Sequence, residues 1–409
     1  MSTQRIEKPK TQKWHWLWGP AFVAAIAYVD PGNVAANLTA GAQYGYLLVW
    51  VLVMANTMAM IVQYMSAKLG LVTGKSLPEI LGDRMRFWPR ILFWIQAELI
   101  AAATDLAEVI GGAIALQILF GVPMLTGGII IGLLSLLLLA VQNWRGERSF
   151  EFVVMGLLLV ITVGFVSGLF FTHVDWVATL EGIIPRFKDS QSVLLACSML
   201  GATVMPHAIY IHSSLAEARH GDSKLGVPRL LRATRWDVLA SMIVAGAVNI
   251  AMLLLAAACL QGESGTDSIE GAYEAINGAL GPTVGILFGV GLLASGLAST
   301  SVGAYAGQTI MSGLLHIRIP LLLRRAITLI PALVIIGVGI DPTWALVLSQ
   351  VFLSLGIPFA LIPLVYLTCK REIMGKYTNR RALMVIAIIV TALIVGMNIL
   401  LLEQTIWPS

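Results

Sequence analysis

Charge is what this chain has least of. Only 12% of its 409 residues are charged, whereas 58% are hydrophobic. Soluble domains are usually about 45–50% apolar and about 25% charged. The composition therefore predicts an integral membrane protein. Against this background the formal net charge of +4 gives no reason to expect a nucleic-acid partner.

Cysteine is also scarce, and several chemical motifs are missing. The three cysteines, Cys197, Cys259 and Cys369, stand alone in apolar segments. No CxxC or other paired spacing occurs, which argues against a disulfide framework and a cysteine metal site. The sequence has no HExxH zinc motif, no nucleotide-binding glycine loop and no visible nucleophile–base pattern. We therefore expect neither an enzyme, such as an intramembrane hydrolase, nor an ATP-driven pump, and no bound cofactor.

Long apolar runs are what the chain has instead. A helix of about 20 apolar residues is long enough to cross a bilayer. Windows of that length predict eleven transmembrane helices: 19–45, 47–70, 90–118, 122–142, 150–172, 191–218, 234–260, 283–314, 320–338, 343–368 and 382–402. The expected fold class is therefore an all-α integral membrane protein. No small-residue cleavage site follows the first span, which we expect to remain as an anchor.

The basic residues predict how the helices are oriented. Eleven spans place the two termini on opposite sides of the membrane. If the N-terminus is cytoplasmic, every Lys and Arg except Arg186 and Lys188 falls on the cytoplasmic side, as the positive-inside rule requires. The opposite loop at 261–281 carries four acidic residues and no Lys or Arg. We expect a cytoplasmic N-terminus, an extracytoplasmic C-terminus and a multi-pass protein of the plasma membrane.

The chain is predicted to be one membrane transport domain, because no linker divides residues 1–409. Residues 1–18 form a polar cytoplasmic tail. Helices 1–5 (19–172) and helices 6–10 (191–368) would begin on opposite sides of the membrane, which is the arrangement of two inverted repeats. Helix 11 (382–402) lies outside them.

Two spans carry sequences that break a helix. The first contains DPGN at 30–33, and the sixth contains GATVMPH at 201–207. Proline removes a backbone donor and glycine tolerates non-helical angles. A break at membrane depth survives only where the freed backbone faces protein or a water-filled cavity. Broken helices at matching positions of two repeats indicate the central site of a transporter.

The two breaks together offer a mixed set of metal ligands. Asp30 supplies a carboxylate, and Asn33 an amide oxygen. The second break frees a carbonyl near Ala202 and carries the thioether of Met205. Carboxylate and carbonyl oxygens suit Mg²⁺, Ca²⁺ or Mn²⁺, whereas a thioether favours softer ions. The set predicts a site for Mn²⁺ or Fe²⁺, although a methionine alone is more often an apolar filler. Gln350 in the tenth span either reaches this site in one conformation or hydrogen-bonds a neighbouring helix.

Titratable residues follow the second break. His207 and His212 are five positions apart, so they do not share one helical face and do not form a zinc-protease pattern. An imidazole within a membrane suits a proton relay, and a packing role is the alternative. Asn56, Gln63 and Asn249 are further intramembrane amides, for which helix packing is a sufficient explanation.

The third span carries three carboxylates, Glu98, Asp105 and Glu108, on one helical face. Three buried acids repel one another unless some are protonated or paired with a cation. Arg324 and Arg325, at the start of the ninth span, are the candidate partners. We expect a polar conduit that leads protons toward the cytoplasm. The alternative is a static salt-bridge network between helices 3 and 9.

The DPGN motif, together with MPH and a second histidine, resembles the Nramp family of proton-coupled divalent metal transporters. The resemblance covers nearly the whole chain, including ATDLAEVIGGA at 103–113. It implies the inverted-repeat fold first recognised in bacterial amino-acid/sodium symporters. It implies metal ligands at Asp30, Asn33, Met205 and the Ala202 carbonyl, with Gln350 joining in some states. Positions linked to proton movement would be Asp30, Glu98, Asp105, Glu108, His207, His212 and Arg325.

One segment departs from the family pattern. Residues 296–308 read GLASTSVGAYAGQ, where animal relatives look more like GQSSTMTGTYAGQ. Leu297 and Ala298 thus replace polar residues away from the expected ligands. Family members that lack the methionine resemble magnesium or aluminium carriers, and Met205 argues against that activity here.

The expected function is import of Mn²⁺ or Fe²⁺ with protons by alternating access. The expected partners are the metal ion, protons and the lipid bilayer, and a monomer is compatible with the sequence. The alternative is a sodium- or proton-coupled symporter of amino acids or related small solutes on the same fold. That alternative gives no role to Asp30 together with Met205.

Overall fold

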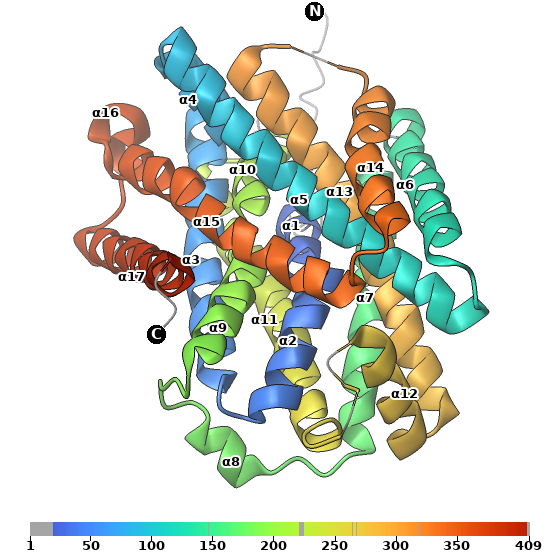
Figure 1. The fold of residues 1–409 in the computed structure, drawn as a ribbon. Coiled ribbons are helices and arrows are strands. Elements are labelled where there is room, and N and C mark those ends of the chain that lie inside the picture. Colours follow the sequence, from blue (N-terminus) through green and yellow to red (C-terminus); the bar gives the residue numbers. More distant parts are fainter. Residues whose placement is uncertain are drawn as a thin grey trace, which may run out of the picture.

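The chain folds into a bundle of helices in a computed structural model (Figure 1). The structure describes residues 19–145, 147–220, 225–263, 265–266, 268–317 and 319–406. Within these ranges all regular structure is helical. The predicted cytoplasmic tail, residues 1–18, lies outside the described residues.

All eleven predicted spans are helical in the structure. Those of the first half are α1 (Pro20–Ile26) with η2 (Ala27–Val29) and α2 (Pro31–Tyr44), then α3 (Val49–Thr73), α5 (Phe87–Phe120), α6 (Met124–Arg145) and α7 (Glu147–Val166). Those of the second half are α9 (Ser190–Thr203) with α10 (Pro206–His220), then α11 (Val227–Cys259), α13 (Pro282–Leu315), α14 (Leu321–Val338) and α15 (Pro342–Cys369), followed by α17 (Arg381–Ile406). Short helices in the connections are α4 (Leu77–Arg84), η3 (Ser167–Phe170), α8 (Trp176–Glu181), α12 (Ile269–Leu280), α16 (Arg371–Met374) and η4 (Gly375–Tyr377).

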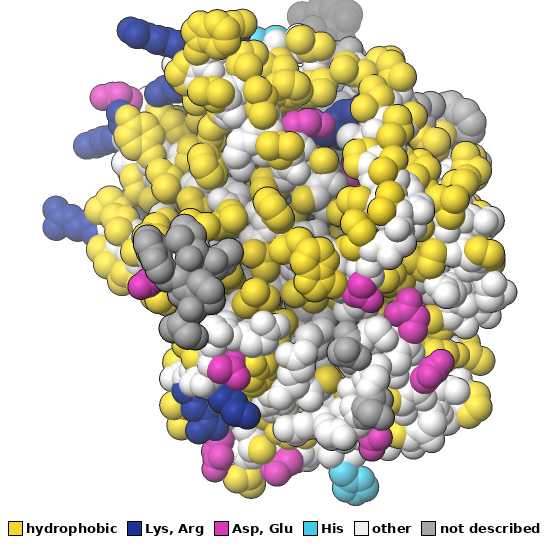
Figure 2. All heavy atoms as spheres, in the orientation of Figure 1, with side chains coloured by type: hydrophobic (Ala, Val, Ile, Leu, Met, Phe, Trp, Pro, Cys, Tyr) yellow, Lys and Arg dark blue, Asp and Glu magenta, His cyan; other side chains and the backbone are white. Residues whose placement is uncertain are grey.

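The helices have the length and composition of a membrane protein. Among the described residues, eight helical segments are long and apolar enough to cross a bilayer, and Pro20–Val29 and Met124–Ala140 are shorter apolar helices. Hydrophobic side chains cover much of the face drawn in Figure 2, as a lipid-facing surface requires. The all-α membrane fold is therefore confirmed, and the predicted eleven crossings are consistent with it.

The two predicted breaks are present and lie in the interior. The first span is interrupted between α1 and α2, and the sixth between α9 and α10. The best apolar window of the α9–α10 segment is 94% buried inside the protein, which places the sixth span at the centre of the bundle. α2 packs against α9, α11 and α15, and α10 packs against α3 and α13. Intact helices thus surround both interrupted ones.

Two glycines allow the intact helices to approach the breaks. A Cβ added to Gly111 of α5 would lie 2.0 Å from the Cβ of Pro31, the first residue of α2. A Cβ added to Gly201 of α9 would lie 2.1 Å from the carbonyl oxygen of Gln350 in α15. Small residues permit such backbone contacts between membrane helices. α5 and α15 are therefore held directly against the interrupted helices.

A methyl group at the first of these crossings should destabilise the fold. In Gly111→Ala the new Cβ meets Pro31, and overpacking of this kind costs about 1–3 kcal/mol. We expect the melting temperature of the purified protein in detergent to fall by several degrees. Gly396→Ala in α17 is the control, because nothing lies within 4 Å of a Cβ there. Equal melting temperatures for the two variants would contradict close packing of α5 on α2.

Candidate metal site at the two helix breaks

The first break lies at Asp30. This residue leaves the helical conformation, with φ −72° and ψ 167°, and Pro31 begins α2 directly after it. The Oδ1 atom of Asp30 accepts a hydrogen bond from the backbone N–H of Asn33 at 2.8 Å. A capping carboxylate followed by proline is a favourable helix start. The sequence that ends one helix thus starts the next and leaves a fully buried carboxylate at the junction.

The second break follows from Pro206. α9 ends at Thr203, Val204 has φ −111° and ψ 65°, and α10 begins at Pro206. In a continuous helix the carbonyl of Ala202 would accept from the N–H of residue 206, which proline does not have. This carbonyl is therefore free to bind another group. Met205 lies in the break itself and is fully buried.

Asn33 joins the two breaks. Its Nδ2 atom donates to Asp30 Oδ1 and to the carbonyl oxygen of Ala202, both at 2.8 Å. Gln350 Nε2 in α15 approaches Asp30 Oδ2 at 3.4 Å. The structure therefore brings four of the five predicted metal ligands into direct contact, with Met205 in the adjoining break. The amide nitrogen of Asn33 thus bonds to two oxygen atoms, Asp30 Oδ1 and the carbonyl oxygen of Ala202. The same two oxygen atoms would attract a cation.

Two further oxygens at this junction are unsatisfied. Asn33 Oδ1 and Gln350 Oε1 are buried and have no hydrogen-bond partner among the described residues. A buried acceptor without a partner costs about 1–3 kcal/mol, and a cation bound by such an oxygen would remove that cost. No group of three or more His, Cys, Asp or Glu side chains that could hold a metal occurs in the described residues. The candidate site therefore depends on one carboxylate supported by amide, carbonyl and thioether groups.

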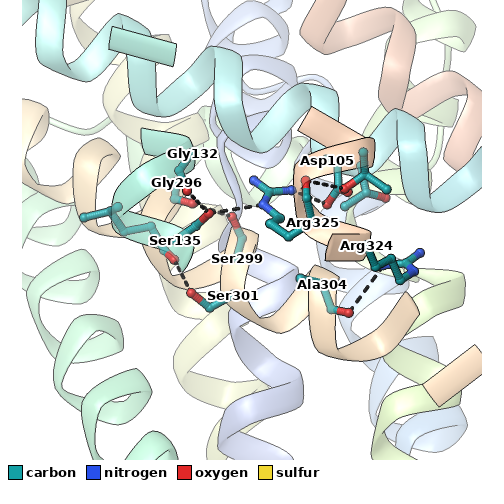
Figure 3. A network of polar contacts seen from close by, with 12 residues as sticks. Asp105, Gly132, Ser135, Gly296, Ser299, Ser301, Ala304, Arg324 and Arg325 are labelled. Carbon is teal, nitrogen blue, oxygen red and sulfur yellow. Dashed lines mark hydrogen bonds and ion pairs between the residues drawn. The ribbon is translucent and has the colours of Figure 1, made fainter. Parts of the chain in front are cut away.

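Two of the three acids of α5 pair with the two predicted arginines, and Figure 3 shows the pair of Asp105 with Arg325. Arg325 NH1 lies 2.9 Å from Asp105 Oδ1, and both side chains are almost completely buried. Arg325 Nε also donates to Ser135 Oγ of α6 at 3.1 Å. Arg324 NH2 lies 2.6 Å from Glu98 Oε1. Each arginine at the start of α14 thus contacts a different carboxylate of α5.

Glu108 occupies the end of this row nearest the first break. It is buried, it is close enough to Asp30 and Asp105 for their charges to interact, and its carboxylate oxygens lie beside Gly303. Asp105 Oδ2 and Glu108 Oε2 have no hydrogen-bond partner among the described residues. The carboxylates of α5 therefore form a polar row that leads from Asp30 toward the arginines of α14; Asp105 and Glu108 are buried, and Glu98 at its end is half-buried.

The two predicted histidines have different surroundings. His207 is buried, interacts electrostatically with Asp105, and its Nδ1 atom has no partner in the described part of the chain. His212 Nδ1 is 2.7 Å from Gln63 Oε1, and Gln63 Nε2 donates to the hydroxyl of Tyr28 in η2. The structure therefore places His207 beside the α5 acids and connects His212 with the first break from the other direction.

Three side chains that sequence reasoning missed or undervalued hold the first break. Asn249 Nδ2 in α11 donates to the carbonyl of Tyr28 at 2.7 Å, and Ser295 Oγ in α13 donates to the carbonyl of Val29 at 2.6 Å. Asn37 Nδ2 in turn donates to Asn249 Oδ1 at 3.0 Å. Asn249 and Ser295 satisfy backbone carbonyls that the break sets free, and Asn37 donates to the side chain of Asn249. Polar residues within spans 1, 7 and 8 are the only signal of these contacts in the sequence, and they do not reveal the partner.

Comparison with known proteins identifies the family. Residues 21–404 match the Nramp model, described as natural resistance-associated macrophage protein-like. The chain belongs to the Nramp family. It is 58% identical over 393 residues to the divalent metal cation transporter MntH of Mycobacterium tuberculosis, a match that covers 96% of this chain and 92% of that relative.

Solved structures agree with this family. The manganese transporter of Eremococcus coleocola, in complex with an aromatic bis-isothiourea compound, superposes with a TM-score of 0.84 at 30% identity, over 98% of this chain and 89% of that one. MHP1, a nucleobase-cation-symport-1 family transporter, has a TM-score of 0.61 at 17% identity, over 95% and 90% of the two chains, and shows the fold alone. The resemblance inferred from the DPGN and MPH motifs is confirmed, and with it a membrane transporter, not an enzyme.

Proposed function

We propose that this Nramp protein imports divalent transition-metal ions, Mn²⁺ or Fe²⁺, together with protons by alternating access. The observation that carries the proposal is the contact between the two breaks, where Asn33 bridges the Asp30 carboxylate and the freed Ala202 carbonyl. The names of its relatives support the same substrate class, because one is a divalent metal cation transporter and another a manganese transporter.

The proposed ligands explain preference for a transition metal. Asp30 provides the only charge, Asn33 and Ala202 provide neutral oxygens, and Met205 provides a thioether. Mg²⁺ demands oxygen ligands in near-octahedral geometry and gives up water reluctantly, so a sulfur position disfavours it. A rotation of the Asn33 amide would turn its unpartnered oxygen toward the ion. Gln350, already beside Asp30, would join when α15 shifts toward the ion.

The proposed proton route begins at the same carboxylate. From Asp30 it would pass Glu108 and Asp105 on α5 and end at Glu98. Arg325 and Arg324 form ion pairs with Asp105 and Glu98 along this route, and His207 lies beside its middle. His212 connects to the break through Gln63 and Tyr28. A static salt-bridge network is the alternative for these residues, and the coupling measurement below separates the two.

The same proposal includes the orientation and the repeats. Most of the Lys and Arg side chains on the face in Figure 2 lie toward the end that carries α4, and most of the acidic ones toward the end that carries α8 and α12. The positive-inside rule then places the α4 end in the cytoplasm. Residues 19–172 and 191–368 would be the two inverted repeats of a plasma-membrane transporter.

Removing the central carboxylate should abolish transport. In Asp30→Ala the ion loses its only charged ligand, and each 1.4 kcal/mol of lost affinity is about tenfold. We expect Mn²⁺ uptake into proteoliposomes to fall at least about tenfold while the folded protein is recovered. Asp341→Ala, which removes the cap of α15, is the control. Uptake by Asp30→Ala at the wild-type rate would rule out this residue as a ligand.

Replacing the thioether should change selectivity more than rate. In Met205→Ala we expect discrimination against Ca²⁺ and Mg²⁺ to fall more than Mn²⁺ transport, because the remaining oxygens no longer disfavour hard ions. Competition of each ion with Mn²⁺ uptake provides the measurement. Met199→Ala is the matched control, since Met199 is equally buried in α9. Unchanged selectivity in Met205→Ala would remove the thioether from the site.

Neutralising the middle carboxylate should disturb coupling. Asp105→Asn leaves Arg325 as an unpaired buried charge, at a cost of about 3–5 kcal/mol, so the ratio of protons to metal is measured on the protein that folds. We expect that ratio, or the proton rate, to fall in liposomes that contain a pH dye. Asp83→Asn, at an exposed ion pair with Lys75, serves as control. A wild-type ratio and rate in Asp105→Asn would favour the static network.

A further inference from the structure

We propose that a basic pocket between α3, α11 and the start of α17 binds the phosphate headgroup of an anionic phospholipid, and that an adjoining apolar groove receives its acyl chains. The site shares no residue with the proposed metal site. It lies at the end of the bundle that we assign to the cytoplasm.

Four cations line the pocket. It is a cavity of about 440 Å³ whose lining includes Lys68, Arg235, Lys376 and Arg380 and contains no acidic residue. None of the four forms an ion pair with an acidic residue in the described part of the chain. Like charges that share a cavity repel, and a bound anion would offset that repulsion.

Lys68 is fixed at the base of the pocket. Only 6% of this residue is exposed, and its Nζ atom donates to Asn379 Oδ1 at 2.8 Å. Asn379 is itself held by Thr368, whose Oγ1 atom accepts from its Nδ2 at 2.9 Å. An ammonium has three donors, and Asn379 uses one of them. A buried charge with no opposite charge beside it is costly, so this position favours an anionic ligand.

The other cations converge on the same space. Arg235 and Arg380 both interact electrostatically with Tyr64, and Arg380 also interacts with Lys68. Lys376 lies over the ring of Tyr377, with its Nζ atom 5.3 Å from the ring centre. Arg235, Lys376 and Arg380 are exposed, so they can reach a headgroup at the membrane surface. The arrangement provides guanidinium forks and ammonium groups, both of which bind phosphate.

An apolar groove distinguishes a lipid from a free phosphate. A second cavity of about 340 Å³ shares Tyr64, Arg235 and Leu383 with the basic pocket and continues over Met60, Ile61, Val238 and Leu239. Met60 lies one turn along α3 from Tyr64, and Val238 lies one turn along α11 from Arg235, in each case away from the basic end. A free phosphate would use the basic pocket alone. Basic pockets between membrane helices that continue into apolar grooves are suited to anionic lipid headgroups.

The first test measures binding without any transported ion. The purified full chain is titrated in detergent with phosphatidylglycerol, phosphatidylcholine or inorganic phosphate, and its melting temperature and retained lipid are followed by thermal unfolding and native mass spectrometry. We expect phosphatidylglycerol to raise the melting temperature and remain bound, and phosphatidylcholine to do neither. Inorganic phosphate that stabilises as strongly as phosphatidylglycerol would overturn the lipid assignment.

Charge variants locate the site. Arg235→Gln with Arg380→Gln removes two exposed cations of the pocket, and we expect at least a tenfold loss of phosphatidylglycerol affinity. Arg229→Gln with Arg371→Gln is the matched control, because both arginines are exposed and neither lines the pocket. Equal affinity in the two double variants would overturn the assignment to this pocket.

A third variant tests the apolar groove. Leu239→Trp fills the groove and should lower the affinity for phosphatidylglycerol. Wild-type affinity for phosphatidylglycerol in that variant would contradict the acyl-chain site.

Discussion

The carbonyl of Ala202 cannot form its helical hydrogen bond, and the centre of the structure depends on that fact. Pro206 has no N–H to offer, so the carbonyl accepts from Asn33 at the opposite break. Asn33 is held in place by Asp30, whose Oδ1 atom accepts hydrogen bonds from both the backbone N–H and the side-chain amide of Asn33. Because Pro206 lacks an N–H, the free carbonyl of Ala202 can bond to Asn33 and so connect the two interrupted helices. Two surrounding intact helices then satisfy the carbonyls of Tyr28 and Val29 at the first break, through Asn249 and Ser295.

α5 connects this centre with the basic end of the protein. Near its middle, Gly111 packs directly on Pro31, so the helix contacts the first break through backbone. Glu108 and Asp105 follow at intervals of one turn, and the last of the row is Glu98, paired with Arg324. Buried ion pairs contribute little net stability compared with apolar packing. Their presence in a span that could have been entirely apolar is what the proposed proton route would require.

The sequence was most informative where the cause of structure is local. Proline and glycine act on their own backbone, so both breaks and their positions could be predicted from DPGN and MPH. Helix lengths followed from apolar runs for the same reason. The connection from His212 through Gln63 to Tyr28 could not be predicted, because it requires three separate spans to meet at one depth. Arg324 and Arg325 were candidates for the α5 acids, but only packing assigns each to its own carboxylate.

The cap of α2 would also set a lower limit on the charge of the cations that the proposed site can hold. The Oδ1 atom of Asp30 already accepts two hydrogen bonds from Asn33, so a cation that binds this atom competes with the cap. An ion that draws this oxygen away must offset a lost helix cap, which is about 0.5–2 kcal/mol. A doubly charged ion attracts the carboxylate about twice as strongly as a monovalent one at the same distance. At the proposed metal site, the start of α2 would therefore act as a threshold that screens cations by charge before ligand geometry discriminates among them.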